Sequence, residues 1–169
     1  GGASVPSGED VTFDQAGTYT VTVTGALACN DFTVSAGVVT FTNSGSSTIT
    51  IFGSMLLASG TVGTWSSSFI PTFNATTSKT ISTNGEAIGA PTFNGVGGTW
   101  TLGSAFAVNN GTLTLTNGTF STSSSNYAVN SVNFSSSNSN TRTLNLNAST
   151  FTISGSGTPW NSATSTNLT

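Results

Sequence analysis

The side chains that could carry acid–base chemistry in this sequence are five carboxylates, because the chain contains no histidine. A glycosidase needs two carboxyl groups that face each other across the scissile bond. Asp14 and Asp31 are the best candidates for such a pair, since each adjoins a phenylalanine of a recurring series. A Ser-His-Asp arrangement is excluded without histidine. We therefore expect no catalytic residues and no enzyme, with a polysaccharide-cleaving carboxylate pair as the distant alternative.

The other reactive side chains are few and isolated in the sequence. Cys29 is the single cysteine, so no internal disulfide can form. Nothing basic lies near it in sequence to lower its pKa, and we expect a small, buried, apolar side chain. The two basic residues, Lys79 and Arg142, are expected to be solvated surface charges. We expect no metal and no cofactor.

The composition excludes several classes of partner. Charged residues make up 4% of the chain and the net charge is −3, against about 25% charged residues in ordinary domains. Nucleic-acid binding needs many Lys and Arg side chains against the phosphates, so it is excluded. Membrane insertion is not expected, because the richest apolar stretch, 51–58, is far shorter than the roughly 20 residues of a spanning helix. The 11 phenylalanines and 3 tryptophans argue against a disordered chain.

An internal repeat is the main structural signal. Pro71-Thr72-Phe73-Asn74 returns as Pro91-Thr92-Phe93-Asn94, a spacing of 20 residues. Following that phenylalanine in both directions gives a series that we call the phenylalanine column: Phe13, Phe32, Phe52, Phe73, Phe93, Leu113, Phe134 and Ile153. A second column lies between its members: Val21, Phe41, Val62, Ile81, Leu102, Phe120 and Leu144.

Between the repeats, the local pattern is that of short strands. Residues 18–24 alternate strictly between Thr and larger side chains, as half-buried strands do, and clusters of Asn, Ser and Gly separate such segments. A β-sandwich or jelly roll would explain the alternation, but it gives no reason for one residue type to return every 20 positions. Stacked coils do. The sequence predicts an all-β, single-stranded parallel β-helix (a β-solenoid) of about eight coils of ~20 residues, right-handed by the general crossover rule.

We interpret residues 1–169 as one β-solenoid domain. Residues 1–12 are expected to form an N-terminal cap or lead-in. Residues 155–169 are expected to continue into further repeats of a longer protein, because the last residues read as the start of another strand.

Two stretches, 132–146 and 149–160, resemble a repeat of known proteins. Both are rich in Ser, Thr, Asn and Gly. They resemble the β-solenoid repeats of large phage structural proteins, phage tail-fibre-like proteins and bacterial surface proteins. Together with the residues around these stretches, the resemblance covers about 45 residues well, and the N-terminal third departs from it. It implies β-solenoid architecture and a virion or cell-surface context, and it supplies no catalytic residue.

Exposed aromatic rings are the candidates for ligand binding, since such rings stack on sugars. Trp65 and Trp160 lie in turn-like contexts, and Tyr127 is the third candidate. Trp100 has the same strand parity as Leu102 of the second column and is expected to point inward. A threonine precedes each member of the second column and could form one outward face: Thr20, Thr40, Thr61, Thr80, Thr101, Thr119 and Thr143.

These observations favour a structural and adhesive role. The sequence predicts a β-solenoid segment of a phage tail fibre or virion surface protein that presents a surface for attachment to the host or to a cell-surface glycan. A bacterial cell-surface adhesin repeat is the first alternative, and an ice-binding protein that uses a threonine-rich face is the second. We expect an extracellular or virion-surface location. A homotrimer or an end-to-end assembly is compatible with the exposed end coils of such a fold.

Overall fold

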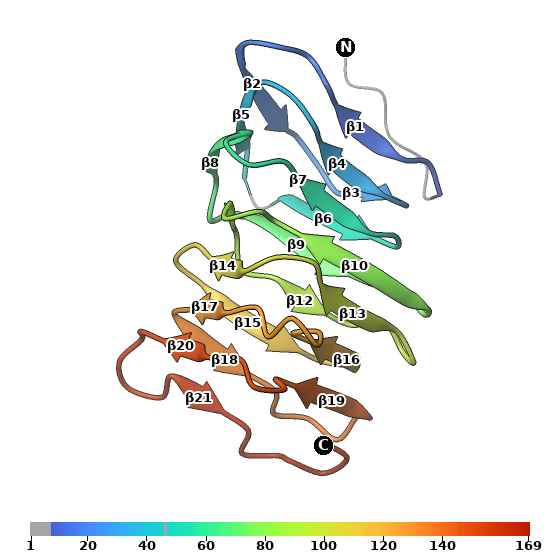
Figure 1. Cartoon of the computed structure of the whole chain (residues 1–169), viewed down its shortest axis with the longest axis vertical. Helices are drawn as coiled ribbons and strands as arrows, with labels where there is room; N and C mark the ends of the chain where they lie inside the picture. The colour runs from blue at the N-terminus through green and yellow to red at the C-terminus, as the bar shows by residue number, and fades with distance from the viewer. Residues whose placement is uncertain (1–7, 46) are drawn as a thin grey trace.

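The computed structural model describes residues 8–45 and 47–169. Every regular element in these residues is a β-strand, and the chain winds into a stack of parallel coils (Figure 1). Each coil supplies three strands, one to each side of the stack, and the longest sheets contain seven strands. The parallel β-solenoid predicted from the sequence is therefore confirmed, with seven turns in place of about eight.

The strands group into three sides that we call the first, second and third faces. The first face is β1 (Val11–Phe13), β4 (Phe32–Val34), β7 (Met55–Leu57), β10 (Ser78–Ser82), β13 (Thr99–Leu102), β16 (Gly118–Ser121) and β19 (Arg142–Asn145). The third face is β3 (Leu27–Cys29), β6 (Ser47–Ile51), β9 (Phe69–Phe73), β12 (Thr92–Phe93), β15 (Thr112–Leu115), β18 (Asn133–Ser135) and β21 (Trp160–Asn161).

The second face consists of two separate sheets. The strands of the first of these sheets are β2 (Thr18–Val23), β5 (Val38–Asn43) and β8 (Val62–Trp65). The strands of the other are β11 (Ala87–Ile88), β14 (Phe106–Val108), β17 (Val129–Ser131) and β20 (Phe151–Ile153). Between β8 and β11 the strand pairing is interrupted, so this face alone is not continuous along the stack.

The turns differ in length, and this explains the smaller number of coils. Phe73 pairs with Phe93 after 20 residues, whereas Phe134 pairs with Trp160 after 26. Extra residues are absorbed at the corners between faces, where turn-forming Asn, Ser and Gly are common. Strand β1 begins at Val11, within the residues 1–12 that were predicted to form a cap or lead-in. Residues 1–7 of that prediction lie outside the described residues.

The phenylalanine column is only partly correct. Phe73 stacks on Phe93, with ring centroids 4.9 Å apart and planes at 10°. This matches the spacing of neighbouring strands. Leu113 likewise pairs with Phe134. The other members lie elsewhere: Phe13 and Phe32 on the first face, Phe52 at a corner, and Ile153 on the second face. Most coils contain more than 20 residues. Residues chosen at a fixed spacing of 20 therefore shift in position from coil to coil and lie on different faces.

The second column breaks in the same way. Val21 pairs with Phe41 on the second face, but the next partner of Phe41 is Trp65, not Val62. Two further predicted neighbours pair correctly on the first face, namely Ile81 with Leu102 and Phe120 with Leu144.

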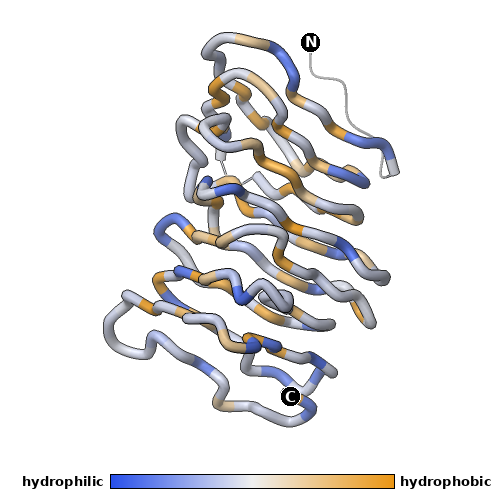
Figure 2. Tube along the Cα trace, in the orientation of Figure 1, coloured by the Kyte–Doolittle hydropathy of each residue, from blue (hydrophilic) through white to orange (hydrophobic). Residues whose placement is uncertain are grey.

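The core is one continuous apolar column inside the three faces. Strand residues alternate between buried and outward positions, as in Phe69–Phe73, where the first, third and fifth residues are buried. Figure 2 shows apolar residues in every coil and strongly hydrophilic residues mainly where the chain turns between faces. Burying one such Phe or Leu contributes about 1.5–3 kcal/mol. With charged residues at 4% of the chain, this column of side chains and the backbone ladders hold the stack together.

A β-bulge ends the regular pairing of the second face. Val39 pairs with Val62 and Thr40 with Thr64, so Gly63 is an extra residue in β8. A Cβ atom at Gly63 would lie 2.9 Å from Val38 Cγ1, so a larger residue there would require the exposed Val38 side chain to move. Bulges increase the local twist and interrupt pairing. The turn that contains this bulge is long, with Met55 paired to Ile81, and the second-face strand of the following turn, β11, begins a new sheet.

Candidate functional site

The three aromatic residues proposed for ligand binding do not form one surface. Trp65 is 2% exposed, and its indole N–H donates to the carbonyl oxygen of Phe69 at 2.8 Å. The prediction that Trp65 is exposed is therefore wrong. Tyr127 is half-buried against the core. Trp100 is fully buried as expected.

Trp160 is exposed for a different reason from the one predicted. It pairs with Phe134 in the ladder of the third face, and the two ring centroids are 4.4 Å apart. Its side chain therefore continues an inward row of the core. It is 42% exposed because β21 is the last strand of that sheet in the stack.

The seven predicted threonines also fail to form one row. Thr20 and Thr40 are neighbours on the second face, Thr80 and Thr101 on the first. Thr119 and Thr143 pair on the first face too, in a different row. Thr61 is buried at a corner, where its hydroxyl donates to the carbonyl oxygen of Ala58 at 2.5 Å. The single face predicted from these residues is wrong, because threonines at equal sequence spacing lie on different sides of the coils.

A longer outward row lies on the third face instead. It runs through paired positions in six successive strands: Thr50, Thr72, Thr92, Thr114, Ser135 and Asn161. All six side chains are half-buried, between inward residues of the core. In the part of the chain that is described, no strand of the third face contains a charged residue. This row presents hydroxyl and amide groups about 4.8 Å apart, the spacing of neighbouring strands.

The signal for this row was present in the repeat. In Pro71-Thr72-Phe73 and Pro91-Thr92-Phe93, the phenylalanine is inward, and alternation places the threonine outward. The threonine beside each of these inward phenylalanines is therefore the residue that marks the row. The neighbouring outward row is mixed, with Thr48 paired to Ile70 and Thr112 paired to Asn133.

The carboxylates do not form the predicted pair. Asp14 follows β1 and Asp31 precedes β4, so the two residues lie at opposite ends of neighbouring parallel strands. Asp31 is instead next to Asp10, whose Oδ1 accepts a hydrogen bond from the Asp31 backbone N–H at 3.0 Å. Parallel pairing brings strand starts together, so residues that precede two neighbouring strands meet.

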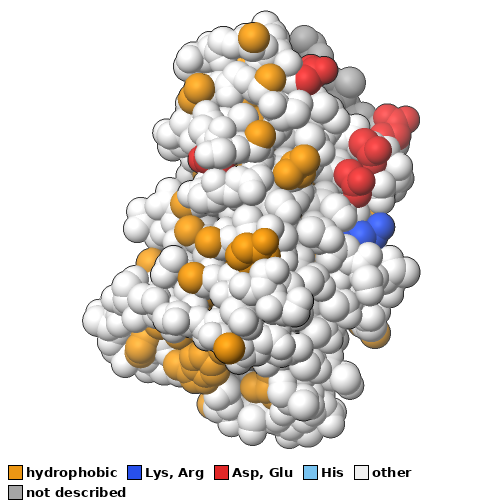
Figure 3. All heavy atoms as spheres, viewed as in Figure 1, with side chains coloured by type: hydrophobic (Ala, Val, Ile, Leu, Met, Phe, Trp, Pro, Cys, Tyr) orange, Lys and Arg blue, Asp and Glu red, His pale blue; other side chains and the backbone are white. Residues whose placement is uncertain are grey.

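These acids form a hydrogen-bonded ladder at the corner before the first face. Asp31 Oδ1 accepts from the backbone N–H of Ser54 at 2.7 Å, and Ser54 Oγ accepts from that of Thr80 at 3.2 Å. Hydrogen bonds from the Asp31 backbone and from the Asn30 side chain lower the pKa of Asp10, with a smaller contribution from Lys79. Figure 3 shows most of the visible acidic side chains along one edge of the first coils, with a basic one below them. Each acid thus caps a strand start.

Arg142 is buried, which corrects the expectation of a solvated surface charge. It is 1% exposed. All five of its guanidinium N–H groups have acceptors: the hydroxyl and carbonyl oxygens of Ser136, and the carbonyl oxygens of Asn140, Thr164 and Thr166. No donor is left for a ligand, so Arg142 has a structural role.

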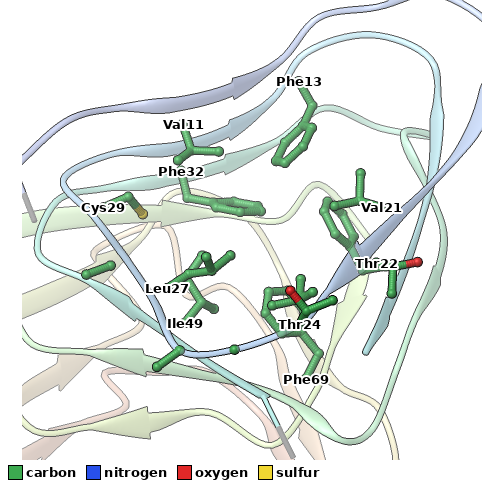
Figure 4. A pocket seen from close by; sticks show the side chains of 15 residues that line it. Val11, Phe13, Val21, Thr22, Thr24, Leu27, Cys29, Phe32, Ile49 and Phe69 are labelled. Carbon is green, nitrogen blue, oxygen red and sulfur yellow. The ribbon is translucent and has the colours of Figure 1, made fainter. Parts of the chain in front are cut away.

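Cys29 faces an apolar cavity in the first turns. The cavity has a volume of about 370 Å³. Figure 4 shows Val11 and Phe13 on one side of it and Leu27 and Ile49 on the other. Cys29 is fully buried, as predicted, and burial raises the pKa of its thiol to about 12, with smaller contributions from Asp10 and Asp31. At neutral pH the thiol is protonated and is a poor nucleophile.

The geometry thus offers rows of neutral hydroxyl and amide groups. Residues 8–45 and 47–169 contain no group of three or more His, Cys, Asp or Glu side chains arranged to hold a metal ion. The same residues include no helix with the length and apolar character needed to cross a membrane. Comparisons of the chain with protein-family models, with curated proteins and with solved structures find no match.

Proposed function

We propose that this chain is a structural and adhesive segment of a phage tail fibre or virion surface protein, which attaches to a neutral glycan of the host surface. The observation that carries the proposal is the chemistry of the outward side chains. They are mostly hydroxyl and amide groups held in rows by a parallel ladder, as in the row from Thr50 to Asn161. Such groups recognise sugar hydroxyls by hydrogen bonds and do not depend on ion pairs.

The rigidity of the scaffold supports the same role. A stacked core, with contacts such as Phe73 on Phe93, extends the chain along one axis and presents side chains at fixed positions. Rigid presentation lowers the entropy lost on binding. A fibre segment needs both properties, extension and a presented surface.

Glycan-array binding of the labelled protein tests this proposal. The array carries bacterial envelope polysaccharides and animal glycans, and binding is measured at low and at high salt. We expect binding to neutral bacterial polysaccharides that changes little with salt, because the attraction between opposite charges is what salt screens. Binding to animal glycans alone supports the adhesin alternative. Absence of binding to every glycan contradicts the proposal.

Ice binding is the second candidate, and the third face favours it. The threonines of the row from Thr50 to Thr114 lie in four successive strands, so their hydroxyl and methyl groups repeat at one spacing. We expect thermal hysteresis in the wild type and its loss in Thr92→Lys, which puts a charged side chain into the row. Thr101→Lys is the matched control on the first face and should retain the activity. Absence of thermal hysteresis in the wild type excludes this candidate.

A further inference from the structure

A cleft lies on the second face, where the strand pairing is interrupted. Its volume is about 290 Å³, and it is bordered by the end of one sheet and the start of the next. Within residues 8–45 and 47–169, no pairing joins β8 to β11. The residues that border the cleft are Val62, Gly63, Thr64, Trp65, Glu86, Ala87 and Asn109.

The bulge at Gly63 explains why the cleft is there. The extra residue shifts the register of β8 against β5 and leaves the far edge of β8 without a partner strand. Bulges occur often beside functional sites, because they interrupt pairing and redirect side chains. The Val38 side chain approaches Gly63 closely, so a larger residue at this position would require Val38 to move.

The cleft contains polar groups with unused hydrogen-bonding capacity. Glu86 Oε1 accepts from the backbone N–H of Gly60 at 2.5 Å, and the described residues offer no partner to its other carboxylate oxygen. Asn109 Nδ2 reaches the carbonyl oxygen of Trp65 only at 3.5 Å. The exposed hydroxyl of Thr64 donates to the carbonyl oxygen of Gly63 at 2.8 Å, and its oxygen can still accept a hydrogen bond from a ligand. Val62 and Ala87 add apolar surface beside them.

We propose that this cleft binds one neutral sugar ring of the glycan, an inference that rests on the proposed glycan attachment. A sugar ring has hydroxyl donors on its edge for the Glu86 carboxylate and C–H groups on its face for Val62 and Ala87. Hydrogen bonds to a carboxylate are roughly twice as strong as neutral ones. The volume lies just below the range of about 300–1,000 Å³ typical of drug-sized ligands, which fits one ring.

The charges around the cleft define the class of sugar. Among the described residues, Glu86 is the only charged one that borders the cleft, and no basic side chain does. Uronic and sialic acids are therefore repelled. A single carboxylate also provides too few oxygen ligands for a calcium site, which takes six to eight. A neutral hexose or N-acetylhexosamine remains.

The test is an NMR titration of the amide signals with methyl glycosides. The panel contains the methyl glycosides of glucose, mannose, galactose and N-acetylglucosamine, with methyl glucuronide as the acidic comparison. We expect saturable shifts at Gly63, Thr64, Ala87 and Asn109 for at least one neutral sugar. Glu86→Gln keeps the side-chain shape and should weaken binding about 10-fold, as loss of a charge-assisted hydrogen bond implies. Glu9→Gln is the matched control and should leave the affinity unchanged.

The outcomes separate this inference from the proposed function. Shifts confined to the cleft and lost in Glu86→Gln support it. If the wild type binds an array glycan and Glu86→Gln binds it equally well, the cleft is not the site, although glycan attachment stands. Shifts on the third face, or equal affinity for methyl glucuronide, also overturn the inference. If the wild type binds no glycan and no glycoside, both proposals fail.

Discussion

Arg142 Nη2 donates to the carbonyl oxygen of Thr164 at 2.6 Å, across the step from one turn to the next. The same nitrogen donates to the carbonyl oxygen of Ser136 at 2.8 Å. One buried side chain therefore holds together the corners of the sixth and seventh turns. Its positive charge is balanced by carbonyl dipoles, and none of its hydrogen-bond acceptors is a carboxylate.

Replacing Arg142 should loosen both corners. Arg142→Met leaves the carbonyl groups of Ser136 and Thr164 without their donor, and each hydrogen bond to a charged group contributes about 1.5–3 kcal/mol. Because the freed carbonyl groups can become hydrated at the corners, we expect a total loss of ~2–4 kcal/mol in the free energy of unfolding. Urea denaturation followed by circular dichroism measures this loss. Lys79→Met is the control and should change stability by less than about 0.5 kcal/mol. Equal effects of the two substitutions contradict the role of Arg142.

The fold was predictable from the sequence because its signals are local or periodic. Strict alternation indicated strands, and the return of Pro-Thr-Phe-Asn indicated stacked coils. The number of turns was not predictable from the period, since the corners add residues without changing the strands. The step from Phe134 to Trp160 shows this, because it is 26 residues long and still joins neighbouring strands.

The site was less predictable, because it depends on which face each residue occupies. Thr61 and Thr80 follow the same spacing rule, yet one lies buried at a corner and the other in a strand. The burial of Arg142 requires acceptors more than 20 residues further on, which no local pattern indicates. Trp65 is buried in the strand that contains the bulge at Gly63, and a bulge has no clear signature in one sequence.

Phe93 should be among the most sensitive positions in the core. Its ring lies 4.9 Å from those of Phe73 and Phe120 and 5.3 Å from that of Trp100. Phe93→Ala removes these contacts and leaves a cavity, for which we expect a loss of ~3–5 kcal/mol. Phe52→Ala is the comparison, since Phe52 is half-buried at a corner, and it should cost less than half as much. Thermal unfolding of both variants is the measurement. Equal losses would mean that the two residues occupy equivalent core positions, contrary to the structure.

Cys29 should be unreactive until the protein unfolds. Its thiol is buried and its pKa is raised to about 12, against about 8.5 in an unfolded chain. The folded state therefore favours the protonated thiol. This contribution to stability is fully present below the unfolded pKa and is lost as pH rises toward the folded pKa. We expect no reaction with a disulfide reagent at pH near 8, and rapid reaction in denaturant. Rapid labelling of the native protein contradicts this account.

A Cys29→Ala variant isolates the alkaline effect. Its stability should decline less than that of the wild type as pH rises above about 8.5, because it has no thiol to ionise. Denaturant midpoints measured across alkaline pH give the comparison. The same decline in both proteins assigns the alkaline sensitivity to other groups.

Asp10 should make the first coils sensitive to acid. Its pKa is lowered because its carboxylate accepts hydrogen bonds from the Asp31 backbone and from Asn30 Nδ2 at 2.8 Å. A lowered folded pKa means that the stabilisation is fully present above the unfolded pKa of about 3.9 and is lost as pH falls through the folded value. Asp10→Asn should be less stable than the wild type at neutral pH, and the difference should shrink in acid. Denaturant midpoints across this pH range measure it. Asp14→Asn is the matched control at an exposed carboxylate and should leave the stability at neutral pH unchanged. If Asp10→Asn keeps the wild-type pH dependence, the corner ladder does not depend on the charge of Asp10.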